Sequence, residues 1–129
     1  MYIQNLNGIG TNDIAGNFEE ITAHMREIQA DIICFQEHNL STEQTQIRNM
    51  LHRIVKNTWP LSKPKLVIAQ SPVQYPSPSK PGGTLQIITG NLTGNVILTH
   101  ADALGRWTAI KLTGKNENNI LIINYYQKH

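Results

Sequence analysis

Asn5, Asn7 and Glu37 are the residues whose types and positions most suggest chemistry in this chain. Asn5 and Asn7 lie in segment 1–8, which alternates loosely between apolar and polar residues and then reaches an Asn-Gly turn, as a short strand does. Glu37 directly follows the apolar run 31–36, which we expect to be a buried strand. A carboxylate at the carboxyl end of a parallel strand lies where the sheet opens to ligands and is a suitable ligand for Mg²⁺. Amide side chains on the same rim can orient that carboxylate or donate to a phosphate oxygen.

These residues also have plainer interpretations. An Asn before Gly is common for backbone reasons, and a Glu after a strand can be a solvated loop residue or a capping partner. No nucleotide-binding glycine motif is found, because neither G-x-x-x-x-G-K nor G-x-G-x-x-G occurs. With one cysteine no zinc site is indicated, and histidines without metal-type spacing are expected at the surface: His24, His38, His52, His100 and His129.

Two amphipathic helices are expected to support the first strands. The first begins at a cap formed by Asn12 or Asp13 and ends near Ala30, because apolar residues recur there at helical spacing. The second begins at Ser41, with Gln44 completing a capping box, and ends by the Trp-Pro pair at 59–60. Strand, helix and strand joined by short connections predict a parallel strand pair.

The rest of the chain has the texture of short strands. Segment 65–70 is a further strand candidate, and segment 71–83 contains four prolines and is expected to be an irregular loop. Glycine-rich turns then separate four strand candidates in the manner of an antiparallel meander, namely 84–89, 95–100, 107–113 and 120–126. We therefore predict an α/β fold of the α+β type, with one mixed sheet and two helices.

Composition narrows the class of protein. A length of 129 residues suits one domain, which we take as 1–129, and 40% hydrophobic residues are typical of a globular chain. The net charge of +2 neither requires nor excludes a phosphate-bearing partner. Cys34 lies inside an apolar run and is expected to pack as a core residue. We expect an intracellular protein, in the nucleus or cytoplasm, without a membrane span.

Segments 4–8 and 30–37 together resemble the first two motifs of the endonuclease/exonuclease/phosphatase superfamily. Segments 81–84, 104–107 and 122–126 are similar to the succeeding strands of its retrotransposon-type members, so the resemblance covers nearly the whole chain. It implies a four-layer α/β sandwich, of which this chain would supply the N-terminal half. It also implies Mg²⁺-dependent hydrolysis of a phosphodiester in DNA.

The resemblance assigns roles to five residues. Glu37 would ligate Mg²⁺, Asn5 would orient the metal site and the scissile phosphate, and Asn7 would lie beside them. Tyr126 matches the family tyrosine near the phosphate. Arg106 would either help to order its strand or contact the substrate backbone. Asn5, Glu37 and Tyr126 are thus the candidate catalytic residues, and Asn7 and Arg106 the candidate substrate-binding residues.

The sequence departs from the family pattern in its last residues. The Gly-Asp-x-Asn strand, the later Asp and the Ser-Asp-His ending are not found, and His129 comes too early to replace the catalytic histidine. We therefore expect a chain that is inactive alone, with a bare apolar sheet face that invites self-association or a complementing chain. Two alternatives stay open: a non-catalytic binding or scaffold module on the same fold, and a fragment of a small-molecule phosphoesterase.

Overall fold

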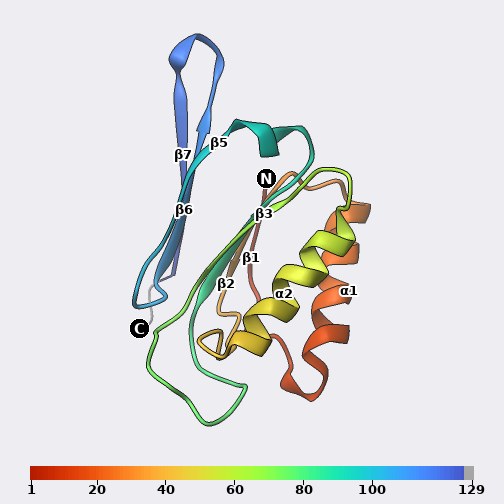
Figure 1. Cartoon of the computed structure of the whole chain (residues 1–129), viewed down its shortest axis with the longest axis vertical. Helices are drawn as coiled ribbons and strands as arrows, with labels where there is room; N and C mark the ends of the chain where they lie inside the picture. The colour runs from red at the N-terminus through yellow and green to blue at the C-terminus, as the bar shows by residue number, and fades with distance from the viewer. Residues whose placement is uncertain (127–129) are drawn as a thin grey trace.

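The computed structural model describes residues 1–126, which form two β-sheets and two α-helices (Figure 1). The first sheet has the order β1 (Tyr2–Asn5), β2 (Ile32–Gln36), β4 (Thr84–Ile88) and β3 (Lys65–Ala69). The second contains β5 (Val96–Ala101), β6 (Trp107–Thr113) and β7 (Asn119–Tyr125). The helices are α1 (Ile14–Glu27) and α2 (Thr45–Thr58), and three short 3₁₀ segments are Thr11–Asp13, Gly90–Asn95 and Lys115–Glu117. No helix within 1–126 is long and apolar enough to cross a membrane.

The predicted fold class is confirmed, and so is the parallel pairing of β1 with β2. The prediction of one mixed sheet is wrong, because the chain forms two sheets. β4 pairs with β2 on one side and with β3 on the other, so no edge of β4 is left for the next strand. The segment Gly90–Asn95 then carries the chain to a second layer, where β5, β6 and β7 form the antiparallel meander.

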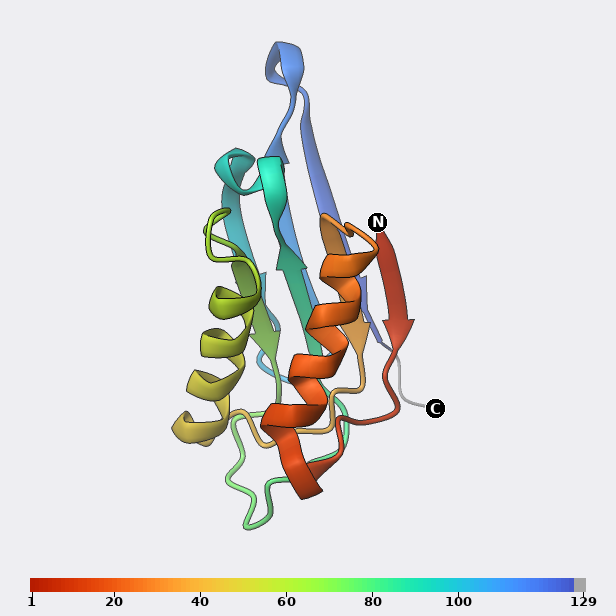
Figure 2. The same ribbon diagram turned by 90° about the vertical axis from the view of Figure 1, so that its right-hand side faces the viewer.

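The layers follow from the alternation of side chains along the strands. Ile33 and Phe35 of β2 pack with Phe18 of α1 and Leu51 of α2 on one face of the first sheet. Figure 2 shows both helices lying against this face. Cys34, between Ile33 and Phe35, points to the opposite face and packs with residues of the second sheet. Cys34 is buried as predicted, and burial raises the pKa of its thiol to about 11.

The expected bare sheet face is also largely absent. Ile88 and Val67 of the first sheet pack directly against Ile110 and Ile122 of the second. The prediction of an uncovered face is therefore wrong, because the second sheet of the same chain covers the first. The exception is β1, where the side chain of Ile3 remains 63% exposed.

The two helices begin differently from each other. Asp13 caps α1 as predicted, with its Oδ1 accepting from the backbone N–H of Gly16 at 3.1 Å. α2 begins at Thr45, and the predicted capping box at Ser41 is wrong. The Ser41 hydroxyl donates instead to the carbonyl of Ser77 at 2.6 Å, and the Gln44 amide donates to the same carbonyl at 3.1 Å. Both side chains thus hold the proline-rich loop rather than the helix.

The proline-rich loop 71–83 is irregular as predicted, but it is firmly attached. The ammonium group of Lys80 donates to the carbonyls of Ser71 and Val73 and lies 3.4 Å from a carboxylate oxygen of Glu43. Lys80 and Glu43 are both buried at the side chain. A buried charge needs such partners, and they fix the path of the loop between β3 and β4.

Candidate functional site

The carboxyl ends of β1 and β2 form a common rim at one end of the first sheet. Asn5 pairs with Gln36 in the parallel register, so Glu37 lies one residue beyond the partner of Asn5. The chains stay together past the strands, because Leu6 N donates to Gln36 O at 2.9 Å and Gly8 N donates to Glu37 O at 2.8 Å. The structure therefore brings Asn5 at the end of β1, Asn7 just after it and Glu37 just after β2 to the same end of two neighbouring strands.

Tyr126 reaches this rim from the second sheet. It follows β7 directly, and its backbone N–H donates to the carbonyl of Arg106 at 2.8 Å. A hydrogen bond with the Glu37 carboxylate raises the pKa of the Tyr126 phenol, because ionising the phenol would remove the donated proton and place two negative charges together. The Tyr126 phenol therefore lies close enough to Glu37 for the carboxylate to affect its pKa.

The backbone at the rim adopts an uncommon conformation. Asn7 has φ of 54° and Glu37 has φ of 53°, both in the left-handed region. The backbone N–H of Asn7 donates to Oδ1 of Asn5 at 2.9 Å, which is the turn-forming contact of an Asx side chain. Asn5 therefore shapes the turn, while Glu37 holds a conformation that surrounding contacts must stabilise.

Arg106 lies at the start of β6, next to the rim. Its Nε donates to Oδ2 of Asp102 at 2.9 Å, and its backbone N–H donates to the same oxygen at 3.1 Å. The hydrogen bond from Arg106 holds the pKa of the Asp102 carboxyl below its usual range. These hydrogen bonds order the turn before β6. The Arg106 side chain is still 57% exposed, so its cation is also accessible to solvent.

A polar contact between the sheets, which the sequence does not predict, connects them next to the rim. Asn124 of β7 is 2% exposed, and its Nδ2 donates to the carbonyls of Phe35 at 3.0 Å and Leu85 at 2.9 Å. Gln36 Nε2 donates to Oδ1 of Asn124. Side chains alternate along β7, so Asn124 lies on the same face as buried Ile122. A polar residue at such an inward position is the feature of the sequence that could have indicated this contact.

The predicted surface position of His38 is wrong. The His38 side chain is fully buried beside Gly83. Its Nδ1 accepts from the backbone N–H of Leu40 at 3.0 Å, and its Nε2 lies 3.1 Å from the carbonyl of Ala69. Burial lowers the pKa of His38 to about 4, so the ring is neutral at physiological pH. His24, His52 and His100 are exposed as expected, and His129 lies outside the described residues.

The donor set of the rim suits a hard cation. Glu37 contributes a carboxylate, and Asn5 and Asn7 contribute amide groups, which are oxygen ligands of the kind that Mg²⁺ prefers. No group of three His, Cys, Asp or Glu side chains able to hold a metal is found within residues 1–126. Among the described residues of the rim, Glu37 is the carboxylate that would ligate such a cation, with Asn5 and Asn7 beside it.

Next to the rim is an apolar pocket of about 400 Å³. Val73, Tyr75 and Leu104 contribute apolar surface, and Arg106 and Tyr126 form the side toward the rim. Gly105 also lines the pocket, with φ of 77° and with the backbone of Gln70 so close that a Cβ would lie 2.8 Å from its Cα. Only glycine fits this position without displacing the turn that carries Arg106.

Comparison with known proteins bears on the fold of the chain. No protein-family profile matches the sequence, and no curated protein matches it. Among solved structures, the chain is similar to an endonuclease/exonuclease/phosphatase family protein from Leptotrichia buccalis C-1013-b, with a TM-score of 0.59 and 12% sequence identity. The match covers 98% of this chain and 52% of that protein, so the chain spans about half its length. The chain thus has a fold found in the endonuclease/exonuclease/phosphatase family.

Proposed function

We propose that this chain carries one part of the active site of a Mg²⁺-dependent phosphodiesterase that cleaves DNA, as in the endonucleases of retroelements. The observation that carries the proposal is the common rim of the paired strands β1 and β2, where Asn5 and Glu37 lie, joined to β7 by the hydrogen bond between Gln36 and Asn124 two residues before Tyr126. A carboxylate, a phenol and amides converging from two sheets can bind a cation and a phosphate together.

The roles follow from the chemistry of each side chain. Glu37 would hold the cation, which when bound polarises a phosphoryl oxygen. The Tyr126 phenol would donate to a phosphate oxygen when the substrate displaces its contact with Glu37. Asn5 would keep the turn and direct its amide toward the same phosphate. Arg106, with Asp102 fixing its guanidinium, would contact the phosphodiester backbone.

The apolar pocket favours a nucleic acid over a small phosphoester. A nucleobase or deoxyribose needs an apolar surface close to the phosphate, and the pocket formed by Val73, Tyr75 and Leu104 adjoins Arg106 and Tyr126. A small phosphoester would leave this surface bare. We therefore take DNA as the substrate class.

The described residues do not provide a general base for the attacking water. His38 is buried, and the carboxylate of Asp102 is bound by Arg106. Glu37 cannot both hold a cation and activate a nucleophile. We therefore propose that the chain has no nuclease activity by itself and that further residues complete the site.

Plasmid nicking tests this proposal. Supercoiled plasmid is incubated with the purified chain in Mg²⁺, beside a Glu37→Ala variant, and neither protein is expected to nick it. Nicking by the wild type that is lost in Glu37→Ala would contradict the proposed inactivity while supporting the site. Equal nicking by both proteins would place the activity elsewhere.

Cation binding is tested separately, because it does not require activity. Mn²⁺ replaces Mg²⁺, and its binding is followed by electron paramagnetic resonance in the wild type, in Glu37→Gln and in Glu19→Gln. Glu19 is an exposed residue of α1 away from the rim and serves as the matched control. Weak binding by the wild type and Glu19→Gln, with loss in Glu37→Gln, is expected. Unchanged binding in Glu37→Gln would exclude the proposed cation site.

A further inference from the structure

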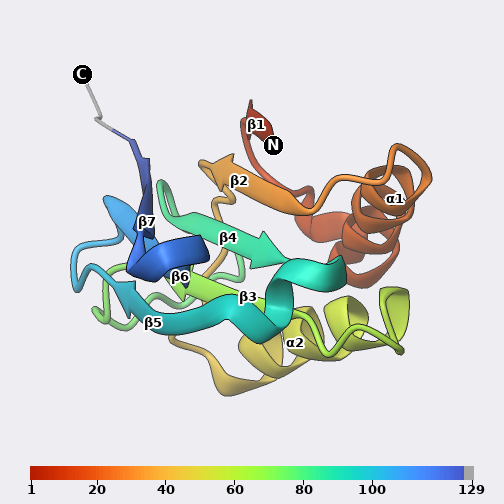
Figure 3. The ribbon, with the colours of Figure 1, turned by 90° about the horizontal axis from the view of Figure 1, so that it is seen from above.

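The end strands β1 and β7 of the two sheets lie on the same side of the molecule (Figure 3). β1 ends the first sheet and β7 ends the second, and each pairs with a single strand within residues 1–126. Figure 3 shows these two end strands on one side of the sandwich, with β3 and β5 on the opposite side. β3 and β5 pack on each other, whereas Ile3 of β1 is 63% exposed. β3 and β5 also end their sheets, but they contact each other, whereas β1 and β7 do not pack on each other to the same extent.

The backbone of β1 has hydrogen-bonding groups directed to this side. Leu6 N donates to Gln36 O of β2, so the N–H of Leu6 points inward toward the sheet. Backbone groups of successive residues in a strand point to opposite sides. The N–H and C=O groups of Ile3 and Asn5 therefore point away from β2, as those of an unpaired edge do.

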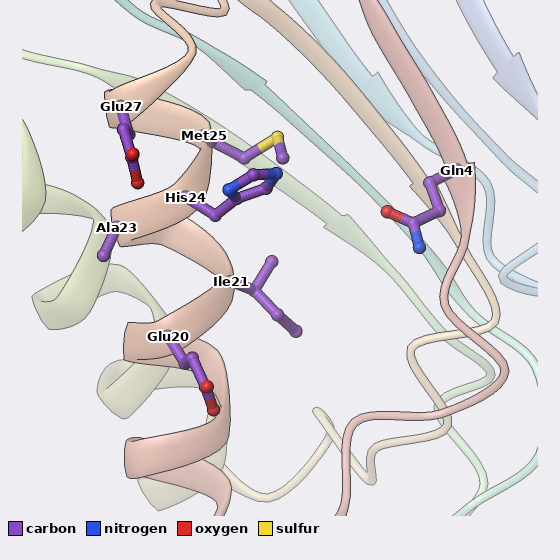
Figure 4. Close-up of a pocket in the computed structure, with 7 residues that line it drawn as sticks. All are labelled: Gln4, Glu20, Ile21, Ala23, His24, Met25 and Glu27. Carbon is purple, nitrogen blue, oxygen red and sulfur yellow. The ribbon is translucent and has the colours of Figure 1, made fainter.

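A groove runs beside β1 on the helix side of the first sheet. It lies between β1 and α1, has a volume of about 550 Å³ and is lined by Gln4 of β1 and by Ile21, His24 and Met25 of α1 (Figure 4). The lining on α1 also contains two carboxylates, those of Glu20 and Glu27. The groove thus combines an apolar floor with negatively charged side chains along its helix side.

We propose that β1 and this groove bind an extended segment of a second polypeptide, which adds a strand to the first sheet. Its main chain would pair with the outward groups of Ile3 and Asn5, in the manner of β-strand addition. An apolar side chain would occupy the groove over Ile21, and Lys or Arg side chains two residues to either side would face Glu20 and Glu27. This partner site is independent of the proposed phosphodiesterase function.

Charge complementarity decides the kind of partner. Neither β1 nor β7 contains Lys or Arg, so the end strands of a second copy would bring no cation to Glu20 and Glu27. A strand ending beside Asn5 would also deliver its next residues to the candidate site.

A designed cationic peptide tests the proposal. The probe is a capped, fluorescently labelled heptapeptide with isoleucine at the centre, lysine two residues to either side and threonine elsewhere. Saturable binding to the purified chain, measured by fluorescence anisotropy, is expected. A peptide with glutamate in place of both lysines is expected to bind at least about fivefold more weakly.

Matched variants locate the binding site. Glu20→Lys combined with Glu27→Lys should weaken binding of the lysine peptide about fivefold at low salt, whereas Glu19→Lys on the same helix should leave it unchanged. Ile3→Pro removes an outward N–H without touching a bond to β2 and should abolish binding, whereas Ile3→Val should preserve it. Circular dichroism checks that each variant is folded, and the charge variants keep the test decisive if Ile3→Pro is not.

Three results would overturn the proposal. No saturable binding at millimolar protein would exclude strand addition at this edge. Equal weakening by Glu19→Lys and by the Glu20 and Glu27 double variant would show that the lysine peptide responds to overall charge. A dimer in light scattering that disappears in Ile3→Pro would identify a second copy of the chain, rather than a cationic strand, as the occupant.

Discussion

Gln36 of β2 donates a hydrogen bond from its side-chain amide to Oδ1 of Asn124 on β7, at 2.5 Å across the interface between the two sheets. The two residues are 88 positions apart in the sequence. Glu37 follows Gln36 directly, and Tyr126 lies just beyond Asn124. This polar contact between the sheets therefore lies directly beside the place where Glu37 and Tyr126 approach each other.

Replacing Asn124 by alanine should destabilise the protein by about 3 kcal/mol. The variant loses donors to Phe35 O and Leu85 O and leaves the Gln36 amide without its acceptor. Urea unfolding followed by circular dichroism measures the change. Asn91→Ala, at an exposed position of the Gly90–Asn95 segment, is the control and should shift stability by less than about 0.5 kcal/mol. Equal stability of the two variants would contradict the role of Asn124.

The contact between Glu37 and Tyr126 can be measured without any substrate. Because Glu37 raises the pKa of the Tyr126 phenol, the replacement Glu37→Gln should lower the pH at which this tyrosine ionises. Ultraviolet absorbance during alkaline titration reports phenolate formation, and subtraction of the Tyr126→Phe curve isolates the signal of Tyr126. An unchanged midpoint in Glu37→Gln would show that the two side chains do not interact in solution.

Gly82 and Gly83 form a matched pair for testing the packing around His38. Both have positive φ, of 88° and 86°, so alanine at either position should cost about 1 kcal/mol for the backbone. A Cβ at Gly82 meets open space, whereas a Cβ at Gly83 would lie 2.3 Å from the His38 ring.

Gly83→Ala should therefore destabilise the protein by roughly 2 kcal/mol more than Gly82→Ala in urea unfolding. The extra cost arises because the buried ring has hydrogen bonds on both nitrogens and cannot move aside freely. If both alanine variants lost the same stability, the close packing of His38 against Gly83 would be wrong.

His38 should make stability depend on pH in a defined window. Its pKa is about 4 in the folded protein against an ordinary value of 6.5, so between these values only the unfolded chain takes up the proton. The contribution of His38 to the free energy of unfolding should therefore be constant above about pH 7 and fall by about 3 kcal/mol as the pH drops from 6.5 to 4.

Urea unfolding at several pH values, in the presence of EDTA, measures this dependence. His38→Gln should remove most of it, whereas His24→Gln, at an exposed position of α1, should retain it. A pH dependence of the same size in both variants would assign it to other groups.

Local patterns in the sequence determined several features of this protein. Alternating apolar residues and a strand, helix and strand order predicted the parallel β1 and β2 pair, and an Asp before an apolar stripe predicted the cap of α1. Asn5 and Glu37 were expected on one rim, because parallel strands joined by a crossover helix end at the same edge. These features depend on neighbours within one element or one connection, which a sequence displays directly.

Contacts between distant segments decided the rest. The division into two sheets depends on β3 and β2 occupying both edges of β4, and the burial of His38 depends on β3 and Gly83 meeting around it. Ser41 and Gln44 have the spacing of a capping box, yet the loop carbonyl of Ser77 competes for both side chains and binds them. A polar side chain takes the partner that tertiary packing brings within reach, and the residues along the sequence do not identify that partner.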